Sequence, residues 1–156
     1  GHTKGCTTWT MKVQEAGRTY DVVIIGSPNV NPGYQLVNNA LYPQIASDYE
    51  HMFRVLKSLP CDIFLGAHGG YFDLETKYAR LKEGAQTPFI DRKGYRKYVA
   101  AKEEAFRTEM AKQKRTWLHT ETDPKQFSSG NPCFLAPSVV SRPIPGCQLP
   151  SRLAGL

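Results

Sequence analysis

The chain has 156 residues, 40% of them hydrophobic, which is enough for one domain with its own core. It contains no stretch near the roughly 18 consecutive apolar residues that span a membrane, so we expect no membrane partner. A formal net charge of +6 permits nucleic-acid binding, but the basic residues are scattered and the densest group, at residues 92–97, begins a predicted helix. We therefore expect a solvated helix face there and no nucleic-acid partner.

Two β-strands are predicted first. Residues 7–13 alternate between apolar and polar side chains around Trp9, which is typical of a strand. Residues 22–25 are a continuous apolar run, which indicates a strand buried on both faces. Gly17 lies in the turn between them, so the sequence predicts an antiparallel hairpin.

A long loop, a helix and a third strand follow. Residues 26–43 hold three prolines and four asparagines, which predicts a loop. Residues 45–59 carry apolar side chains at three- and four-residue steps, which predicts a helix that ends at Pro60. Residues 61–70 form a short buried strand that runs into a glycine turn, with His68 at its end, where α/β folds often place working residues.

The remaining chain changes character near residue 114. Residues 71–91 are predicted to form one irregular helical turn and a loop, and residues 94–114 a long amphipathic helix. Residues 115–156 hold six of the eleven prolines without periodicity, so we predict a Pro-rich, disordered tail. The order strand, strand, helix, strand, helix predicts half of a layered α/β domain and suggests that sequence is missing.

Two of the four histidines are candidate metal ligands. His2 and His68 are each flanked by glycine and small residues, which allow a tight loop to aim the ring inward. From these residues alone, a hydrogen-bonded structural histidine is the simpler interpretation, and it is also our expectation for His51 and His119. A catalytic zinc takes three protein ligands and a water, so any zinc site here is incomplete or shared with residues outside the chain.

Other chemistries have no support in the motifs. The chain contains no nucleotide-binding glycine motif and no G-x-S-x-G nucleophile motif. Its four cysteines form no C-x-x-C pair, so we expect no zinc knuckle and no thioredoxin-like site.

Three segments resemble one family. "GHTKGCTTW", residues 1–9, resembles the G-H-T-x-G-[SC]-T-x-W segment of metallo-β-lactamases, in particular the third subclass of class B. Residues 26–53 resemble the loop and following helix of these enzymes, and residues 59–91 their last core strand, final metal-ligand histidine and closing loop. The resemblance covers residues 1–114.

The resemblance implies the C-terminal half of an αββα sandwich that holds two zinc ions at one edge. It assigns His2 to the first zinc site and His68 to the second. It places Ser27, Tyr34 and Thr7 near the substrate. Cys61 matches a cysteine that is disulfide-bonded in some members, but its usual partner region has no cysteine, so we predict no bridge.

The H-x-H-x-D-H motif of the family, which supplies the other ligands, is absent from this chain. His2 is then an internal ligand, and a missing N-terminal half is needed to complete the site. The complete parent enzyme would hydrolyse the amide bond of small-molecule β-lactams, causing antibiotic resistance, in the periplasm or outside the cell. Two alternatives stay open: another metallo-hydrolase, such as a lactonase or thioesterase, and a non-catalytic fragment.

Overall fold

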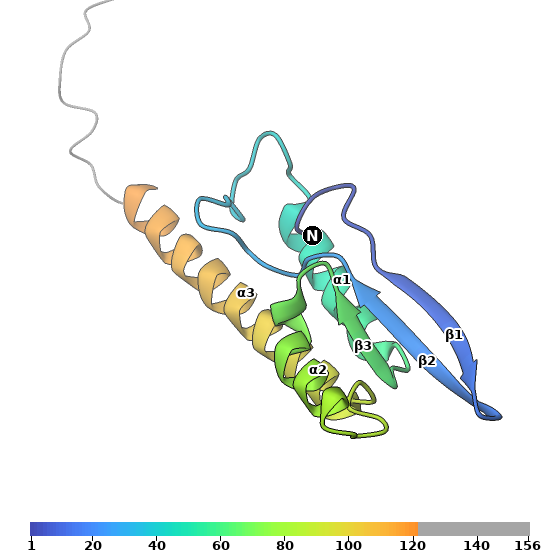
Figure 1. The fold of residues 1–156 in the computed structure, drawn as a ribbon. Coiled ribbons are helices and arrows are strands. Elements are labelled where there is room, and N and C mark those ends of the chain that lie inside the picture. Colours follow the sequence, from blue (N-terminus) through green and yellow to red (C-terminus); the bar gives the residue numbers. More distant parts are fainter. Residues whose placement is uncertain (122–156) are drawn as a thin grey trace, which may run out of the picture. The chain divides into compact units, whose positions relative to one another are not determined.

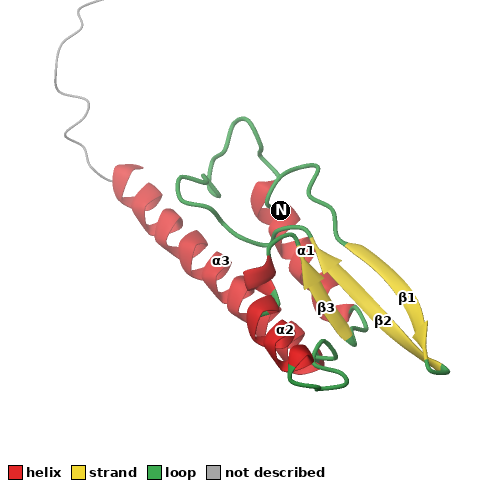
Figure 2. Ribbon diagram, in the orientation of Figure 1, coloured by secondary structure: helices red, strands yellow, loops and turns green. Residues whose placement is uncertain are grey.

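The computed structural model describes residues 1–121, so residues 122–156, most of the predicted tail, lie outside the described part. None of the described helices is long and apolar enough to cross a membrane. The elements in chain order, shown in Figures 1 and 2, are β1 (Trp9–Glu15), β2 (Arg18–Ile25), α1 (Ile45–Ser58), β3 (Ile63–Gly66), a 3-10 turn (Gly69–Tyr71), α2 (Leu74–Lys82) and α3 (Arg92–Glu121).

The predicted hairpin is confirmed. Strands β1 and β2 are antiparallel, with Glu15 opposite Arg18. Ala16 and Gly17 between them have φ angles of 48° and 75°, the left-handed pair that a two-residue hairpin turn requires. Glycine accepts this backbone without strain, which explains its place in the turn.

Strand β2 is the centre of the three-stranded sheet, in the order β1-β2-β3. It runs parallel to β3, with Ile25 beside Gly66, and α1 forms the crossover between the two strands. Val22 and Val23 are both buried although they point to opposite faces, as the continuous apolar run predicted.

One face of the sheet forms the core together with the helices. Val23 and Phe64, opposite each other on β2 and β3, pack with α1, which lies behind the strands in Figure 1. The ring of Tyr49 on α1 stacks on Phe106 of α3, with centroids 5.1 Å apart. Because aromatic side chains bury large areas, this cluster dominates the stability of the described residues.

The opposite face of the sheet is also apolar. Cross-strand partners point to the same face, and Trp9 pairs with Ile24 while Met11 pairs with Val22. Trp9 and Met11 are nevertheless 65% and 47% exposed. The described residues therefore leave this face open along β1.

Two predicted boundaries are wrong. Leu74–Lys82 is a helix where a single irregular turn and a loop were expected. Its residues are good helix formers, but Lys77 is its one buried residue. The segment therefore lacks the apolar stripe from which an amphipathic helix is predicted. Helix α3 continues past Lys114 to Glu121, so residues 115–121 are helical where a tail was expected.

A buried carboxylate anchors α3 to the sheet. Asp62, just before β3, accepts hydrogen bonds from the backbone N–H of Asp21 at 2.9 Å and from Nε of Arg92 at 2.5 Å. These bonds, the backbone one first, hold the pKa of Asp62 below its ordinary value. Lys77 of α2, itself buried, pairs with Asp91 at 2.9 Å and lowers the pKa of that carboxyl in the same way.

Candidate metal centre

The predicted site residues gather at the carboxyl ends of β2 and β3. Ile25 ends β2 beside Gly66 of β3, and the N–H of Ala67 still donates to the carbonyl of Ile25 at 3.0 Å. Ser27 follows β2 and His68 follows β3, so both leave the sheet at the same edge. The N-terminus lies at this edge in Figure 1 and brings His2 with it. Ligand sites of α/β sheets commonly lie at such an edge.

His2 is held in a defined tautomer. Its Nδ1 lies 2.8 Å from the backbone oxygen of Asn29. A carbonyl oxygen accepts hydrogen bonds only, so Nδ1 carries the proton and Nε2 of the neutral ring keeps a free lone pair. The ring of Tyr34 stacks on His2 at 5.4 Å, with 30° between the planes. Tyr34, predicted to lie near the substrate, therefore borders the imidazole directly.

His68 is exposed and begins the 3-10 turn that follows β3. Its carbonyl accepts the N–H of Tyr71 at 3.0 Å, which closes the turn. The imidazole of His68 and the ring of Tyr71 meet edge to face, with centroids 5.1 Å apart and 72° between their planes. The turn thus presents the imidazole to solvent with one side against an aromatic ring.

A hydrogen-bond network connects the loop that holds His2 to Tyr71, whose ring contacts His68. Asn29, whose oxygen binds His2, donates its side-chain amide to the hydroxyl of Tyr71 at 2.9 Å. That hydroxyl donates to Oγ of Ser27 at 3.4 Å, and the N–H of Asn29 donates to the same oxygen at 3.4 Å. Tyr49 reaches in from α1 and donates to the Asn29 carbonyl at 2.6 Å. The loop after β2 and the turn after β3 are therefore fastened to each other.

Thr7 is not part of this network. Its hydroxyl donates to the carbonyl of Gly5 at 3.2 Å, and the residue is exposed. Its neighbour Cys6 does contact the loop, because Sγ accepts the N–H of Ser27 at 3.2 Å. Cys6 and Cys61 are both free thiols, and burial raises the pKa of Cys61 to about 11.

The donor set suits zinc but is incomplete. Two neutral imidazoles are zinc-type ligands, and the His2 tautomer leaves Nε2 available. Within residues 1–121, however, no group of three or more His, Cys, Asp or Glu side chains converges. The other two histidines, His51 on α1 and His119 on α3, are exposed, as expected for residues outside the site.

The sequence did not reveal Asn29, Tyr71 or Tyr49 as members of this network. Asn29 is followed by no recognisable ligand motif, although an aromatic residue directly after His-Gly-Gly was a signal for Tyr71. Tyr49 sits at an apolar position of α1, and nothing in its spacing indicates that its hydroxyl crosses to the loop after β2.

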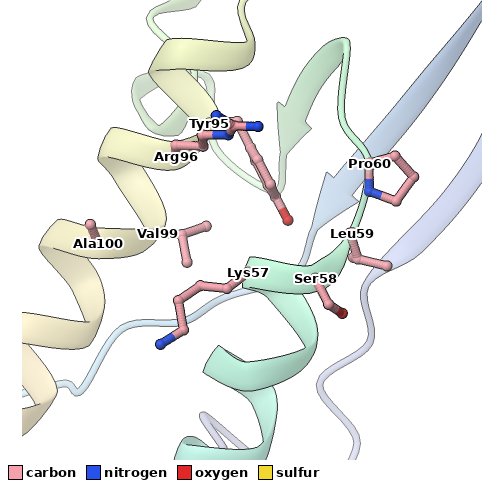
Figure 3. A pocket seen from close by; sticks show the side chains of 8 residues that line it. All are labelled: Lys57, Ser58, Leu59, Pro60, Tyr95, Arg96, Val99 and Ala100. Atoms are coloured by element: carbon pink, nitrogen blue, oxygen red, sulfur yellow. The ribbon is translucent and has the colours of Figure 1, made fainter.

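A separate pocket lies between the end of α1 and the start of α3, away from the histidines (Figure 3). The hydroxyl of Tyr95 points toward α1 and donates to the carbonyl of Leu56 at 2.7 Å. The residues that line it are Lys57, Ser58, Leu59, Pro60, Tyr95, Arg96, Val99 and Ala100. None of the predicted site residues is among them, so this pocket is not the candidate centre.

Comparison with known proteins places the fold. No family model matches the chain. It is 54% identical to the FEZ-1 metallo-β-lactamase of Legionella gormanii, over 73% of this chain and 44% of that one, with a TM-score of 0.72. The subclass B3 enzyme BJP-1 of Bradyrhizobium japonicum is 32% identical, over 75% and 44%, with a TM-score of 0.68. LRA-12, a class B3 di-zinc metallo-β-lactamase from an Alaskan soil metagenome, is 27% identical, over 69% and 41%, at 0.62.

The chain therefore belongs to the metallo-β-lactamases, a zinc-dependent family. Among its neighbours are members of subclass B3, as the three sequence segments indicated. The chain spans less than half of the length of each of these structures, 44% in the case of FEZ-1.

Proposed function

We propose that this chain is one part of a zinc-dependent β-lactam hydrolase and contributes one histidine to each of two zinc sites, His2 to the first and His68 to the second. The observation that carries the proposal is that both imidazoles lie at one edge of the sheet: Asn29 binds Nδ1 of His2 and is hydrogen-bonded to Tyr71, whose ring lies against His68. Similarity to FEZ-1 supports the choice of substrate class.

The residues of the chain have distinct tasks in this proposal. Zinc, when bound, lowers the pKa of a water and so supplies a nucleophile near neutral pH. The Asn29 carbonyl favours the Nδ1–H tautomer of the neutral His2 ring, in which Nε2 has a free lone pair, and the stacked ring of Tyr34 restricts rotation of the imidazole. Ser27 and Tyr34 are the hydroxyl groups at this edge that are offered to a β-lactam. Thr7 is the weakest of the three, since its hydroxyl is engaged with Gly5.

The remaining ligands come, in this proposal, from a segment that carries the H-x-H-x-D-H motif. The open face of the sheet is where such a segment would pack, because Trp9 and Met11 present apolar side chains there. By itself the chain is then non-catalytic and binds zinc weakly, since each site holds one of its ligands. A periplasmic or secreted location belongs to the same proposal.

The test mixes the chain with a metallo-β-lactamase segment that contains H-x-H-x-D-H. Zinc content and hydrolysis of a penicillin, a cephalosporin, a carbapenem and a lactone are measured before and after mixing. We expect no turnover by the chain alone and β-lactam hydrolysis by the mixture. His2→Ala and His68→Ala should each abolish it, whereas His119→Ala, the matched control at an exposed position of α3, should not.

The other outcomes point to the alternatives. Turnover of the lactone without β-lactam hydrolysis would assign the chain to a different metallo-hydrolase. A mixture that binds no zinc and hydrolyses nothing would leave the chain a non-catalytic fragment.

A further inference from the structure

Tyr71 is not one of the proposed zinc ligands, yet it contacts both His68 and the loop that binds His2. Its ring lies against His68 and its hydroxyl bonds to Asn29 and Ser27 of the loop that holds His2. These residues come from the turn after β3 and the loop after β2, which the sheet alone would join only at Ile25 and Ala67.

The surroundings of Tyr71 fix its ring. On one side the backbone of Gly66 lies so close that a Cβ there would be 2.8 Å from Cδ2 of Tyr71. The ring of Tyr98 also packs on Tyr71, at 5.3 Å and tilted by 34°. The glycine at the end of β3 is therefore needed for the ring to lie flat against the strand, and the hydroxyl is aimed at the loop without freedom to swing away.

We propose that Tyr71 is a positioning residue that couples the orientations of His2 and His68 through Asn29. The inference rests on the proposed function for the ligand roles of the two histidines, and on the contacts above for the coupling. Three hydrogen bonds close a ring among Tyr71, Asn29 and Ser27. This ring holds the N–H and the side chain of Asn29, the residue whose carbonyl faces Nδ1 of His2.

The consequence is specific to the hydroxyl. A Tyr71→Phe chain keeps the ring against His68 but releases the Asn29 amide. Tyr49 still binds the Asn29 carbonyl, so the loop stays attached to α1 while its peptide plane is no longer held from the His68 side. His2 then faces a carbonyl that Tyr49 alone still holds, so the preference for its Nδ1–H tautomer is weaker.

The experiment uses the full chain, metal-free, at a pH where imidazole is neutral. Nitrogen NMR of the histidine rings measures the tautomer of His2, and a zinc titration followed at the same ring measures its affinity. We expect the wild type to be mainly the Nδ1–H tautomer. Tyr71→Phe should shift the population toward Nε2–H and weaken zinc binding at His2 about 10-fold, the usual cost of losing an outer partner of a metal-binding histidine. Tyr78→Phe, a half-exposed tyrosine on α2, should behave as wild type.

Asn29→Ala provides a second route to the same answer, because it removes the amide and keeps the backbone carbonyl. It should match Tyr71→Phe, and the double variant should be no worse than either single one. An unchanged tautomer in Tyr71→Phe, or additive effects in the double variant, would overturn the coupling. If Tyr71→Phe loses the NMR signals of the core, Asn29→Ala decides by the same criterion.

The two proposals fail in different ways. A wild-type chain whose histidines ignore zinc, alone and with the complementing segment, contradicts the proposed function. The tautomer shift in Tyr71→Phe is measured without metal, so it still supports or overturns the coupling in that case.

Discussion

The two faces of the sheet are both apolar, but they differ in what covers them. On the face toward the helices, Val23 and Phe64 are 0% and 1% exposed. On the other face, Trp9 and Met11 of the neighbouring strand keep 65% and 47% of their surface in water. A strand's own pattern thus shows which side chains avoid water, whereas their actual burial depends on a layer that another segment must supply.

The largest effect is expected on the covered face. Phe53→Ala removes a ring that is 1% exposed and packs on Phe106 at 5.8 Å. The cavity and the lost contacts should lower the free energy of unfolding by about 3–5 kcal/mol, measured by urea denaturation. Phe53→Leu, the matched control, should cost clearly less. A loss near zero for Phe53→Ala would mean that this face is not the core.

A smaller effect is expected at the carboxylate that anchors α3. Asp62→Asn keeps an acceptor for the Asp21 N–H but removes the charge that binds Arg92, and should cost about 1–3 kcal/mol at neutral pH. Glu104→Gln, an exposed position on α3, is the matched control and should change little.

The acid limb of the stability curve tests the same carboxylate. The pKa of Asp62 is lower in the folded chain than its ordinary value of 3.8, so folding releases a proton there. Its contribution is complete above pH of about 4 and is lost as the pH falls through the lower, folded pKa. Asp62→Asn should therefore flatten the acid limb between those values. A wild-type slope of the acid limb in Asp62→Asn would contradict the assignment. The pH dependence that remains in this variant is expected from Asp91, whose pKa is also lowered.

The smallest effect on folding is expected on the open face. Trp9→Ser and Met11→Ser should each lower the stability of the chain by only about 1 kcal/mol, because about half or more of each side chain is already in water. The same changes should weaken association with the complementing segment, measured by titration calorimetry. Val23→Ser, in the adjacent strand but facing the helices, is the contrasting control. An equal loss of unfolding free energy in Trp9→Ser and Val23→Ser would contradict the difference between the two faces.

The sequence predicted most elements because their signals are local. The turn at Gly17, the apolar run at residues 22–25 and the stop at Pro60 each act within a few residues, and all three appear in the structure. Helix α2 was missed because it is stabilised by helix-forming residues and by the buried Lys77–Asp91 pair, neither of which produces an apolar stripe. The length of α3 was underestimated because the helical period fades after Lys114, although no proline or glycine ends the helix before Glu121.

The candidate centre, too, could be predicted from the sequence only in part. The residues around His2 and His68 were sufficient to recognise both as ligand candidates, since glycine-flanked histidines stand in segments that resemble one family. The hydrogen bonds around these histidines could not be predicted from the sequence. Asn29 meets Tyr71 across 42 positions of sequence and Tyr49 across 20.

The sequence by itself therefore determined most of the local elements, the family and the two candidate imidazoles. Only the tertiary structure decided that one asparagine and two tyrosines form a hydrogen-bonded network beside those imidazoles, and that one apolar face stays open along β1. The reason is physical: turn and helix signals come from neighbours along the chain, whereas hydrogen bonds between loops exist only once β2 and β3 lie parallel and end at the same edge.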